Sequence, residues 1–470
     1  MPLFLAIDNG SQSTKTLLVD ERGRVLASAR VGLRPYDTST PGRVVHPDDD
    51  VWNSIATACR RVLERFGGDL DELAGVGLCT IRYCRALLGG DGRLAEPMLS
   101  WMDDRVARAH RETSSAQWVT TSSGYIAHRL TGRRVDAAGN YQGVWPIDQS
   151  TWRWSTSPEP YARTGMPRSL LFDLVDPGGL LGAITADASA ATGLPVGTPV
   201  FATSNDKAVE ALGAGLADER QLLLSLGTYI SSMTPIGVPD GGASYWVNFG
   251  SEPHRYLAES QGIRRGMWTV SWFRSLLEGG AGTGDDGMYD LEALLSREAE
   301  AVPFGSDGVT AVLDWLAPPD APYRRGALLG FSGSQGRAHI YRAILEGIAF
   351  TMADHAQQMA VELGREFDGV VVTGGGARSP LMSQIVSDSF GLPVARAVHD
   401  DAAAIGAAIC AAVGSGHFSD WREATAAMAG QRHVADPSPQ SAADAERLRR
   451  RHRGVRQRVA ELSRWSEEGC

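Results

Sequence analysis

The sequence predicts an α/β protein built from two related domains. A strand, a polar turn containing glycine and a second strand occur over residues 4–19 and again over residues 222–232. Between and after these hairpins, apolar segments of strand length alternate with segments of helical periodicity, which is typical of α/β architecture. The 470 residues allow two to four domains at about 100 to 200 residues each, and 43% hydrophobic residues suffice for proper cores.

The predicted elements follow in chain order. Residues 4–7 and 16–19 form the first hairpin, and residues 25–27 begin a third strand. Residues 51–66 have apolar side chains on one side and predict a helix, whereas residues 76–79 are continuously apolar and predict a buried strand.

The second half continues the alternation. Residues 340–351 have helical periodicity, residues 370–372 form an apolar strand, and the glycine- and alanine-rich residues 402–413 predict another helix. Residues 437–468 are charged and arginine-rich and predict a solvated terminal helix of auxiliary function, and residues 278–286, rich in glycine and acids, predict a mobile loop.

Composition excludes several classes of function. The net charge of −10 and the pI of about 5.5 argue against nucleic acid or an anionic membrane as the main partner. The N-terminus has no basic region followed by an apolar run of signal-peptide length, and no apolar stretch reaches the roughly 18 residues of a membrane span. The five cysteines form no CxxC pair, so we expect thiols in a reducing compartment, the cytoplasm, and no zinc site.

The turn of the first hairpin could bind a phosphate and a metal. The Asp8 carboxylate at a strand end could hold Mg²⁺ through waters, and Gly10 allows the backbone to approach a phosphate closely. Ser11 and Ser13 add hydroxyl donors and Lys15 adds a cation. An ordinary hairpin turn would have the same residues, so the motif alone decides nothing.

Two further glycine-containing turns strengthen this interpretation. Gly227 and Thr228 form the turn of the second hairpin, and two such turns facing each other across a cleft would hold the phosphates of a nucleotide from both sides. Residues 374–376 are three glycines between a buried strand and a helix, which allow close approach of a flat ligand or a phosphate, or merely form a flexible turn. They match neither a Walker A loop nor a dinucleotide-binding fingerprint.

Asp206 is the candidate general base. It follows the strand at residues 199–201 and precedes the helix at residues 208–213, where an aspartate either caps the helix or accepts the proton of a hydroxyl group. Asp103 and Arg105 follow Trp101 in a segment that would otherwise be a surface turn with a local ion pair.

In this order, these segments resemble the FGGY family of carbohydrate kinases, over residues 7–418. The resemblance implies two actin-like ATPase (ribonuclease H-like) domains around a central cleft. The segments that carry it are Asp8 to Lys15, Trp101 with Asp103 and Arg105, Thr198 to Gly215 around Asp206, Ser225 to Thr228, Gly336 to Gly347, Gly374 to Ser379, and Asp401 with Gly406 to Ala408.

The resemblance also implies how the domains divide the work. Residues 1–217 would bind the sugar and supply the base, residues 218–430 would bind ATP, and residues 431–470 would be a helical extension. Asp206 would accept the hydroxyl proton, and Asp8 and Asp206 would hold Mg²⁺. The expected nucleotide contacts are Gly10, Ser11, Gln12, Ser13, Lys15, Gly227, Thr228, Gly374, Gly375, Gly376 and Ser379.

The acceptor half departs from the family pattern. Arg82 lies where glycerol kinases have an Arg-Glu pair, but Tyr83 replaces the Glu, and the xylulokinase stretch is absent as well. We expect a pentulose such as xylulose as substrate, with ribulose, erythritol or glycerol as further candidates, and a homodimer from the habit of the family. The expected substrate contacts are Arg82, Tyr83, Asp103, Asp206 and Trp268.

Two other hypotheses remain open. The altered acceptor half would suit a catalytically silent sugar-binding regulator on the same scaffold, although such a protein would be free to lose Asp206. A general actin-like ATPase without a sugar is disfavoured by the match over residues 338–347 and around Asp206.

Overall fold

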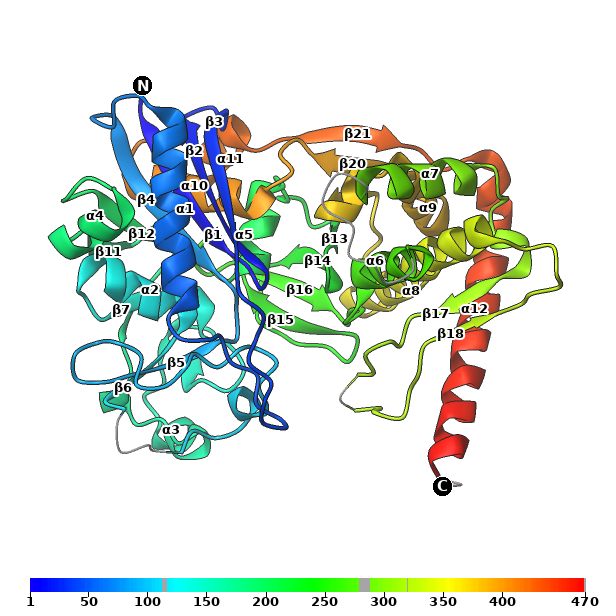
Figure 1. Ribbon diagram of the computed structural model, residues 1–470, viewed down its shortest axis with the longest axis horizontal. Coiled ribbons are helices and arrows are strands. Elements are labelled where there is room, and N and C mark those ends of the chain that lie inside the picture. The colour runs from blue at the N-terminus through cyan, green and yellow to red at the C-terminus, as the bar shows by residue number, and fades with distance from the viewer. Residues whose placement is uncertain (112–115, 279–287, 319, 469–470) are drawn as a thin grey trace.

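The computed structural model of the protein describes residues 1–111, 116–278, 288–318 and 320–468. It contains two large sheets in two domains that lie side by side (Figure 1). The predicted loop at 278–286 lies outside the described residues apart from Glu278.

The first sheet has six strands in the order β11-β12-β4-β1-β2-β3. The hairpin of β1 and β2 is antiparallel, as are the β2–β3 and β11–β12 pairs, whereas β1 pairs in parallel with β4 and β4 with β12. Its strands are β1 (Leu3–Asn9), β2 (Ser13–Asp20), β3 (Val25–Gly32), β4 (Leu73–Thr80), β11 (Leu180–Ala183) and β12 (Pro199–Ala202).

The second sheet repeats this plan. From β16 to β21 its order, β16-β14-β13-β19-β20-β21, has the same sequence of antiparallel and parallel pairs as β3-β2-β1-β4-β12-β11, and β15 adds an edge strand. The duplication predicted from the two hairpins is therefore confirmed. Its strands are β13 (Gln221–Leu226), β14 (Ile230–Ile236), β15 (Tyr245–Phe249), β16 (Tyr256–Ser260), β19 (Gly369–Thr373), β20 (Val394–Ala397) and β21 (Gln431–Ala435).

Helices and short strand pairs surround the two sheets (Figure 1). The helices are α1 (Asp50–Phe66), α2 (Ser122–Thr131), α3 (Pro158–Thr164), α4 (Ala186–Thr192), α5 (Asp206–Gly213), α6 (Gly266–Leu277), α7 (Met288–Glu300), α8 (Arg337–Leu363), α9 (Pro380–Phe390), α10 (Ala402–Gly414), α11 (Trp421–Met428) and α12 (Pro439–Glu468). The paired short strands are β5 (Arg85–Leu88) with β6 (Trp118–Thr121), β7 (Val135–Ala137) with β10 (Asp173–Val175), β8 (Ile147–Asp148) with β9 (Arg153–Trp154), and β17 (Thr310–Val312) with β18 (Ala327–Leu329).

The helix α10 returns from the second half of the chain to complete the core of the first domain. Its alanines pack with Phe4, Ala6 and Val19 in one buried cluster. It also crosses α5 at very short range, since a Cβ added to Gly213 would lie 1.8 Å from the Ala402 carbonyl oxygen. Small residues in both helices thus allow the backbones to touch, and residues 402–428, predicted within the second domain, pack on the first sheet.

The C-terminal segment is more than a solvated helix. Residues 431–435 form β21 at the edge of the second sheet, and α12 packs against α8 and α9. Buried Asp354 of α8 accepts hydrogen bonds from Arg453 at 2.6 and 3.0 Å and from Arg449 at 3.4 Å. The buried Asp354 carboxylate therefore holds the arginine-rich helix α12 against α8.

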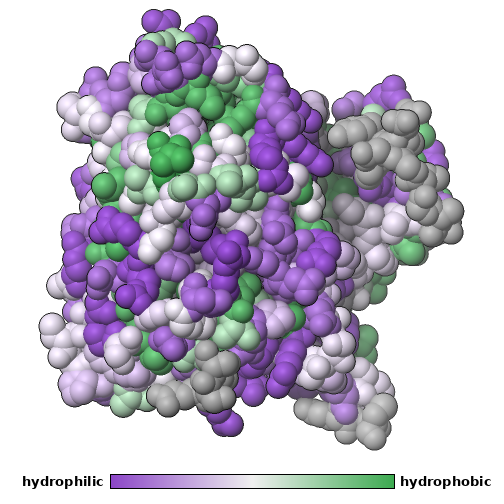
Figure 2. Space-filling view, turned by 60° about the vertical axis from the view of Figure 1, so that its left-hand side comes forward, coloured by the Kyte–Doolittle hydropathy of each residue, from purple (hydrophilic) through white to green (hydrophobic). Residues whose placement is uncertain are grey.

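The surface is mixed in character (Figure 2). On the face shown in Figure 2, hydrophilic side chains predominate and apolar ones form separate patches. Within the described ranges, no helix combines the length and the apolar character needed to cross a membrane.

Candidate active site

Asp206 is the first residue of α5, and it is not the residue that caps this helix. The cap is Asn205, whose side-chain oxygen accepts from the Ala208 N–H at 3.2 Å. One Asp206 oxygen accepts from the Lys207 N–H at 2.9 Å and lies 3.6 Å from Arg82 Nε, and the side chain keeps 26% of its surface exposed. Burial raises the pKa of Asp206, and the cations of Arg82 and Lys207 oppose that shift. The carboxylate is therefore oriented but still accessible.

Asp8 lies at the same edge of the first sheet. Asp8 is near the end of β1, and Asp206 follows β12. Because β1, β4 and β12 run in parallel, β1 and β12 end at the same edge of the sheet. Asp8 and Asp206 are therefore close enough for their charges to interact. Burial raises the pKa of Asp8 to about 7, with Lys15 opposing the shift and the carboxylates of Asp401, Asp206 and Glu210 adding to it. The site thus concentrates negative charge that a cation would relieve.

The turns of the two hairpins meet, as the sequence predicts. Gly10 closes the first turn by donating its N–H to Ser13 O at 3.1 Å. Gln12 Nε2 of this turn lies 3.5 Å from Thr228 Oγ1 of the second turn, across 216 residues of chain. Ser11 accepts from the Tyr36 hydroxyl through its carbonyl oxygen at 3.2 Å. The two hairpin turns, which belong to different domains, are therefore adjacent.

Lys15 is engaged by an ion pair within the site. Its ammonium group pairs with Asp401, the residue that precedes α10. This contact joins the first hairpin to the segment that returns from the second sheet. A nucleotide phosphate would have to share the Lys15 ammonium group with this carboxylate.

The third glycine-rich turn lies against the second hairpin. Gly374 has a positive φ of 81°, and a Cβ there would lie 2.7 Å from the Leu226 carbonyl oxygen, so glycine is required. Gly375 and Gly376 continue into a short 3₁₀ turn, Gly375–Arg378. Ser379 caps α9 by accepting from the Met382 N–H at 3.2 Å, so its hydroxyl oxygen already has a structural partner.

The start of α6 is a part of the site that sequence reasoning missed. Gly266 N–H donates to Thr228 O at 2.8 Å and Met267 N–H to Gly227 O at 3.2 Å, so the N-terminus of α6 rests on the second turn. The only signal in the sequence is a glycine before an apolar, helical stretch. Trp268, the predicted sugar-stacking residue, is on this helix in the second domain, with Arg265 stacked 4.3 Å from its ring centre.

A buried polar network connects the start of α5, where Asp206 lies, to the second sheet. Glu210, one turn after Asp206 on α5, accepts from Lys207 Nζ at 2.9 Å, from Ser225 Oγ at 2.8 Å and from Thr373 Oγ1 at 2.7 Å. Lys207 Nζ also donates to Ser225 Oγ at 2.6 Å. Hydrogen bonds and Lys207 keep the pKa of Glu210 low despite burial. The network fixes α5 against β13 and β19, and sequence reasoning missed it as well.

Arg82 joins the two domains. Its guanidinium group, 10% exposed, donates to both oxygens of Glu259 of β16 at 2.7 Å, and the Glu259 side chain is fully buried. Glu259 also accepts from Ser231 Oγ at 2.9 Å and from Asn248 Nδ2 at 3.0 Å. Arg82 Nε remains directed to Asp206. The predicted acceptor contact is therefore held in place by a residue of the other domain.

The other predicted substrate contacts lie differently. Tyr83 follows Arg82 with a positive φ of 64°, and its hydroxyl lies 3.3 Å from Gln142 Oε1. Asp103 is buried, and its carboxylate accepts from Val44 N–H and from the Arg105 backbone and guanidinium groups, each at 2.9 Å. These partners already occupy both oxygens of Asp103. A contact between Asp103 and a sugar stays a prediction.

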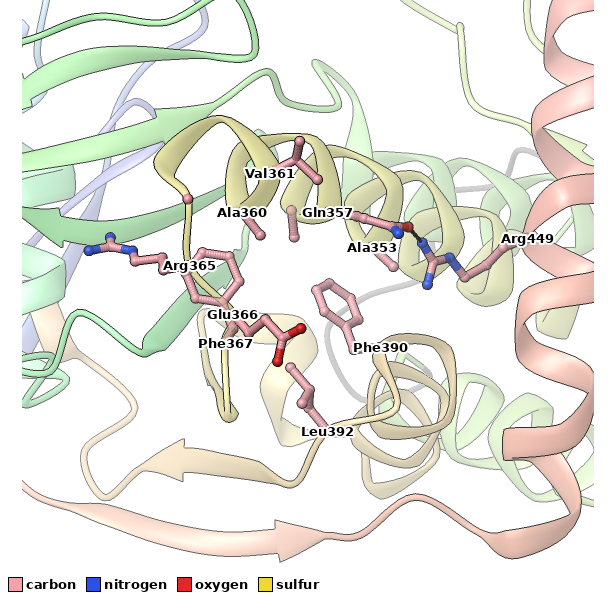
Figure 3. Close-up of a pocket in the computed structure, with 12 residues that line it drawn as sticks. Ala353, Gln357, Ala360, Val361, Arg365, Glu366, Phe367, Phe390, Leu392 and Arg449 are labelled. Atoms are coloured by element: carbon pink, nitrogen blue, oxygen red, sulfur yellow. Dashed lines mark hydrogen bonds between the residues drawn. The ribbon is translucent and has the colours of Figure 1, made fainter.

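A hollow in the second domain lies apart from these residues. A cavity of about 470 Å³ lies between the end of α8, the segment after α9, and Arg449 of α12 (Figure 3). It contains none of the predicted site residues, and its Arg449 is already paired with Gln357 and Asp354. The candidate active site is therefore the region where the turns of the two hairpins lie next to each other.

The duplicated α/β fold, with facing hairpin turns and a carboxylate between its domains, is that of an actin-like protein. Comparison with known proteins gives the family. The N-terminal domain of the FGGY family of carbohydrate kinases matches residues 3–117, and its C-terminal domain matches residues 222–415. The chain belongs to this family and is a carbohydrate kinase.

Relatives agree with this membership. The chain is 43% identical over 425 residues to the uncharacterized sugar kinase YgcE of Escherichia coli (strain K12), covering 90% of this chain and 86% of that protein. Its fold is similar to xylulose kinase from Rhodospirillum rubrum, with a TM-score of 0.82, 23% identity and coverage of 98% and 99%. It is also similar to Plasmodium falciparum glycerol kinase with ADP, with a TM-score of 0.77, 16% identity and coverage of 98% of each chain.

Proposed function

We propose that the protein transfers the γ-phosphoryl group of ATP to a hydroxyl group of a small sugar or polyol, with Asp206 as general base. The observation that carries the proposal is that Asn205 caps α5, which leaves the Asp206 carboxylate accessible beside the two hairpin turns. A base in this position takes the proton from the attacking hydroxyl as the O–P bond forms, and such assistance contributes about 10²–10⁴-fold in rate.

The surrounding charges support this role. Arg82 and Lys207 favour the ionised form of Asp206, which is the form that accepts a proton, while burial raises its proton affinity. The Glu210 network keeps Lys207 and the start of α5 in place. The backbone N–H groups of residues 11–13 and 227–228 would donate to the phosphates, since the Gly10 N–H already donates to Ser13 O. Gly375 would border the adenine and ribose, and closure of the domains would exclude water from the transfer.

Mg²⁺ fits the site as the companion of ATP. Within the described residues, no group of three or more His, Cys, Asp or Glu side chains could hold a metal by itself, so the ion would arrive with the nucleotide and keep several waters. Asp8 and Asp206 are the carboxylates that would hold it. Burial first, and then the carboxylates of Asp401, Asp206 and Glu210, raise the pKa of Asp8 to about 7, and a bound cation would favour the ionised form. When bound, the ion would neutralise charge on the transferred phosphoryl group.

For the substrate, we propose a pentulose such as xylulose first, with ribulose, erythritol and glycerol as further candidates. Xylulose comes first because one structure of similar fold is named xylulose kinase, although a likeness of 23% identity concerns the fold alone. Arg82, Tyr83 and Asp206 would contact the sugar from the first domain. Free thiols at Cys59, Cys79, Cys84 and Cys410 support a reducing compartment, the cytoplasm. A homodimer remains part of the proposal.

The test is an ATP-consumption screen with pentuloses, tetritols, hexuloses and glycerol, followed by Asp206→Asn on the best acceptor. We expect Asp206→Asn to reduce kcat by at least about 10²-fold while ATP affinity stays nearly unchanged. Asp187→Asn is the matched control, since Asp187 also lies in the first turn of a helix with a separate cap, Thr185, but is exposed.

The screen also separates the alternative. No stimulation by any acceptor, together with sugar binding visible as a thermal shift, would support a catalytically silent sugar-binding regulator instead. Retention of most turnover in Asp206→Asn would show that another group is the base.

A further inference from the structure

A small arginine-lined cavity lies in the second domain and shares no residue with the proposed active site. Its volume is about 60 Å³. The loop before α6 contributes Arg264, the segment between β17 and β18 contributes Asp314 and Arg324, α8 contributes His355, and α12 contributes Arg456. Four separate parts of the domain therefore converge on one enclosed space.

The cavity has more guanidinium groups than carboxylates to neutralise them. Arg324 is paired with Asp314 at 2.8 Å, which is the one acidic residue among those that line the cavity. Arg264 uses one nitrogen to donate to the Ala317 carbonyl oxygen at 2.7 Å. Arg456 makes neither a hydrogen bond nor an ion pair within the part of the chain that the structure describes.

The neighbouring carboxylate of α8 does not change this balance. Asp314 and then Asp354 favour the charged form of Arg456 only at a distance, since Asp314 pairs with Arg324 and Asp354 accepts from Arg449 and Arg453. Burial, and then the nearby Arg324 guanidinium group, lower the pKa of Arg456. A partly buried cation without a close counter-charge is costly, and an anion beside it would remove that cost.

His355 adds no charge at neutral pH. Burial, and then Arg456, lower its pKa to about 4, and its Nδ1 lies 2.8 Å from the Gln261 carbonyl oxygen. Because a carbonyl can only accept, Nδ1 carries the proton of the neutral ring. The excess positive charge in the cavity therefore comes from Arg264 and Arg456.

We propose that this cavity is a binding site for a phosphate group, formed by Arg456 and Arg264 and separate from the catalytic site. The space exceeds the roughly 10–15 Å³ that one water needs, and guanidinium groups match the oxygens of phosphate with pairs of hydrogen bonds. The occupant is inorganic phosphate or the phosphate of a monoester. The proposal does not depend on which sugar the enzyme phosphorylates or on the role of Asp206.

The site would link α12 to the nucleotide turn. The loop at 261–264 that forms one wall pairs through Ile263 with Ile230, directly after the turn at Gly227 and Thr228. The opposite wall is α12, which supplies Arg456. This placement gives the arginine-rich C-terminal helix a ligand-binding role besides packing.

The test is calorimetric titration of the full chain with inorganic phosphate, in chloride buffer of matched ionic strength and without nucleotide. We expect saturable binding that weakens at least about tenfold in Arg456→Gln, since charged hydrogen bonds are lost. Arg458→Gln is the matched control, because Arg458 is exposed on the same helix and donates to the carbonyl oxygen of Gly454 at 3.3 Å. Its affinity should equal that of the wild type.

Arg264→Gln provides a second arm on a different element, in case Arg456→Gln does not fold. Weaker binding in Arg264→Gln supports the proposal, and methyl phosphate in place of phosphate distinguishes a monoester site from one for the free ion. Undetectable phosphate binding to the wild type overturns the proposal. Equal affinity in the wild type and in every folded variant overturns it too, since phosphate would then be bound at the nucleotide turns.

Discussion

The ion pair between Arg82 and Glu259 should be among the strongest single contacts between the domains. The perturbation is Glu259→Gln, which keeps the shape of the side chain and removes its charge. Arg82 is then left with 10% exposure and without the carboxylate that accepts two of its hydrogen bonds at 2.7 Å. Its nearest remaining carboxylate is Asp206, 3.6 Å from Nε.

The expected cost follows from burial. Removing one partner of a buried ion pair destabilises a protein by about 3–5 kcal/mol, and we expect the lower end because glutamine can still accept one hydrogen bond. The entropy of unfolding is about 2.1 cal/mol/K per residue, or about 1 kcal/mol/K for this chain. If the domains unfold together, Glu259→Gln should therefore lower Tm by about 3 °C.

The assay is calorimetry beside a matched control, Glu298→Gln. Glu298 also forms a two-bond pair, with Arg337 at 2.6 and 2.9 Å, but on the surface, where such pairs contribute little. Arg82→Leu combined with Glu259→Leu should be less destabilised than Glu259→Gln, because no buried charge is left alone. Equal Tm values for Glu259→Gln and Glu298→Gln would refute the reasoning.

Two further predictions concern Asp8 and the helix crossing. In the absence of ligands, Asp8→Asn should stabilise the protein, and this stabilisation should grow as pH rises from about 4 to 7 and stay constant above about pH 7. The reason is that the Asp8 carboxyl has a pKa near 3.8 in the unfolded chain but about 7 in the folded protein. The pKa change represents roughly 4 kcal/mol, and the gain in stability should be about 1–2 kcal/mol because Asp8 is partly exposed. Urea unfolding of both proteins at pH 5 and pH 8 measures this gain. A stability difference between them that does not change with pH would contradict the prediction. Gly213→Ala should lower Tm by a few degrees, because the new Cβ meets the Ala402 carbonyl oxygen, whereas Gly32→Ala, with no atom near its Cβ, should have little effect on Tm in the same calorimetry; equal Tm values would contradict the close packing.

Local patterns predicted most of the fold. The hairpins, the helix at 51–66, the strand at 370–372 and the terminal helix are all present, because each is specified by the periodicity of its own residues. The strand at 431–435 was missed because its residues alternate only weakly and its partner, β20, is distant in sequence. The packing of α10 on the first sheet was missed for a related reason, since periodicity shows which face is buried but not against what.

In the candidate site, the positions of the turns were predictable because each turn lies at the end of a strand. Asp8, Gly10, Asp206, Gly227 and Gly374 each lie beside a strand end, and the structure brings the turns together. The partners of these residues could not be predicted. Glu259 lies 177 residues from Arg82 in an unremarkable strand, and the acids and hydroxyls around Lys207 come from three elements. Such pairs are created by tertiary packing and leave no local signal.

The chain passes between the two domains three times. The first crossing leads from α5 to the second sheet, the second leads back to α10 on the first sheet, and the third leads out again to β21. The three connecting segments lie close together. Gln431 of the third crossing donates to the carbonyl oxygens of Ala214 and Gly215 at the end of α5, at 3.2 and 3.0 Å. The crossings are thus bound to one another, and the backbones of α5 and α10 touch through small residues, with Val209 of α5 packed in the same buried cluster as α10. Rotation about this point that moves the hairpin turns apart would leave Asp206 attached to α5, but it would have to break the Arg82–Glu259 ion pair and the bonds of Lys207 and Glu210 to β13 and β19.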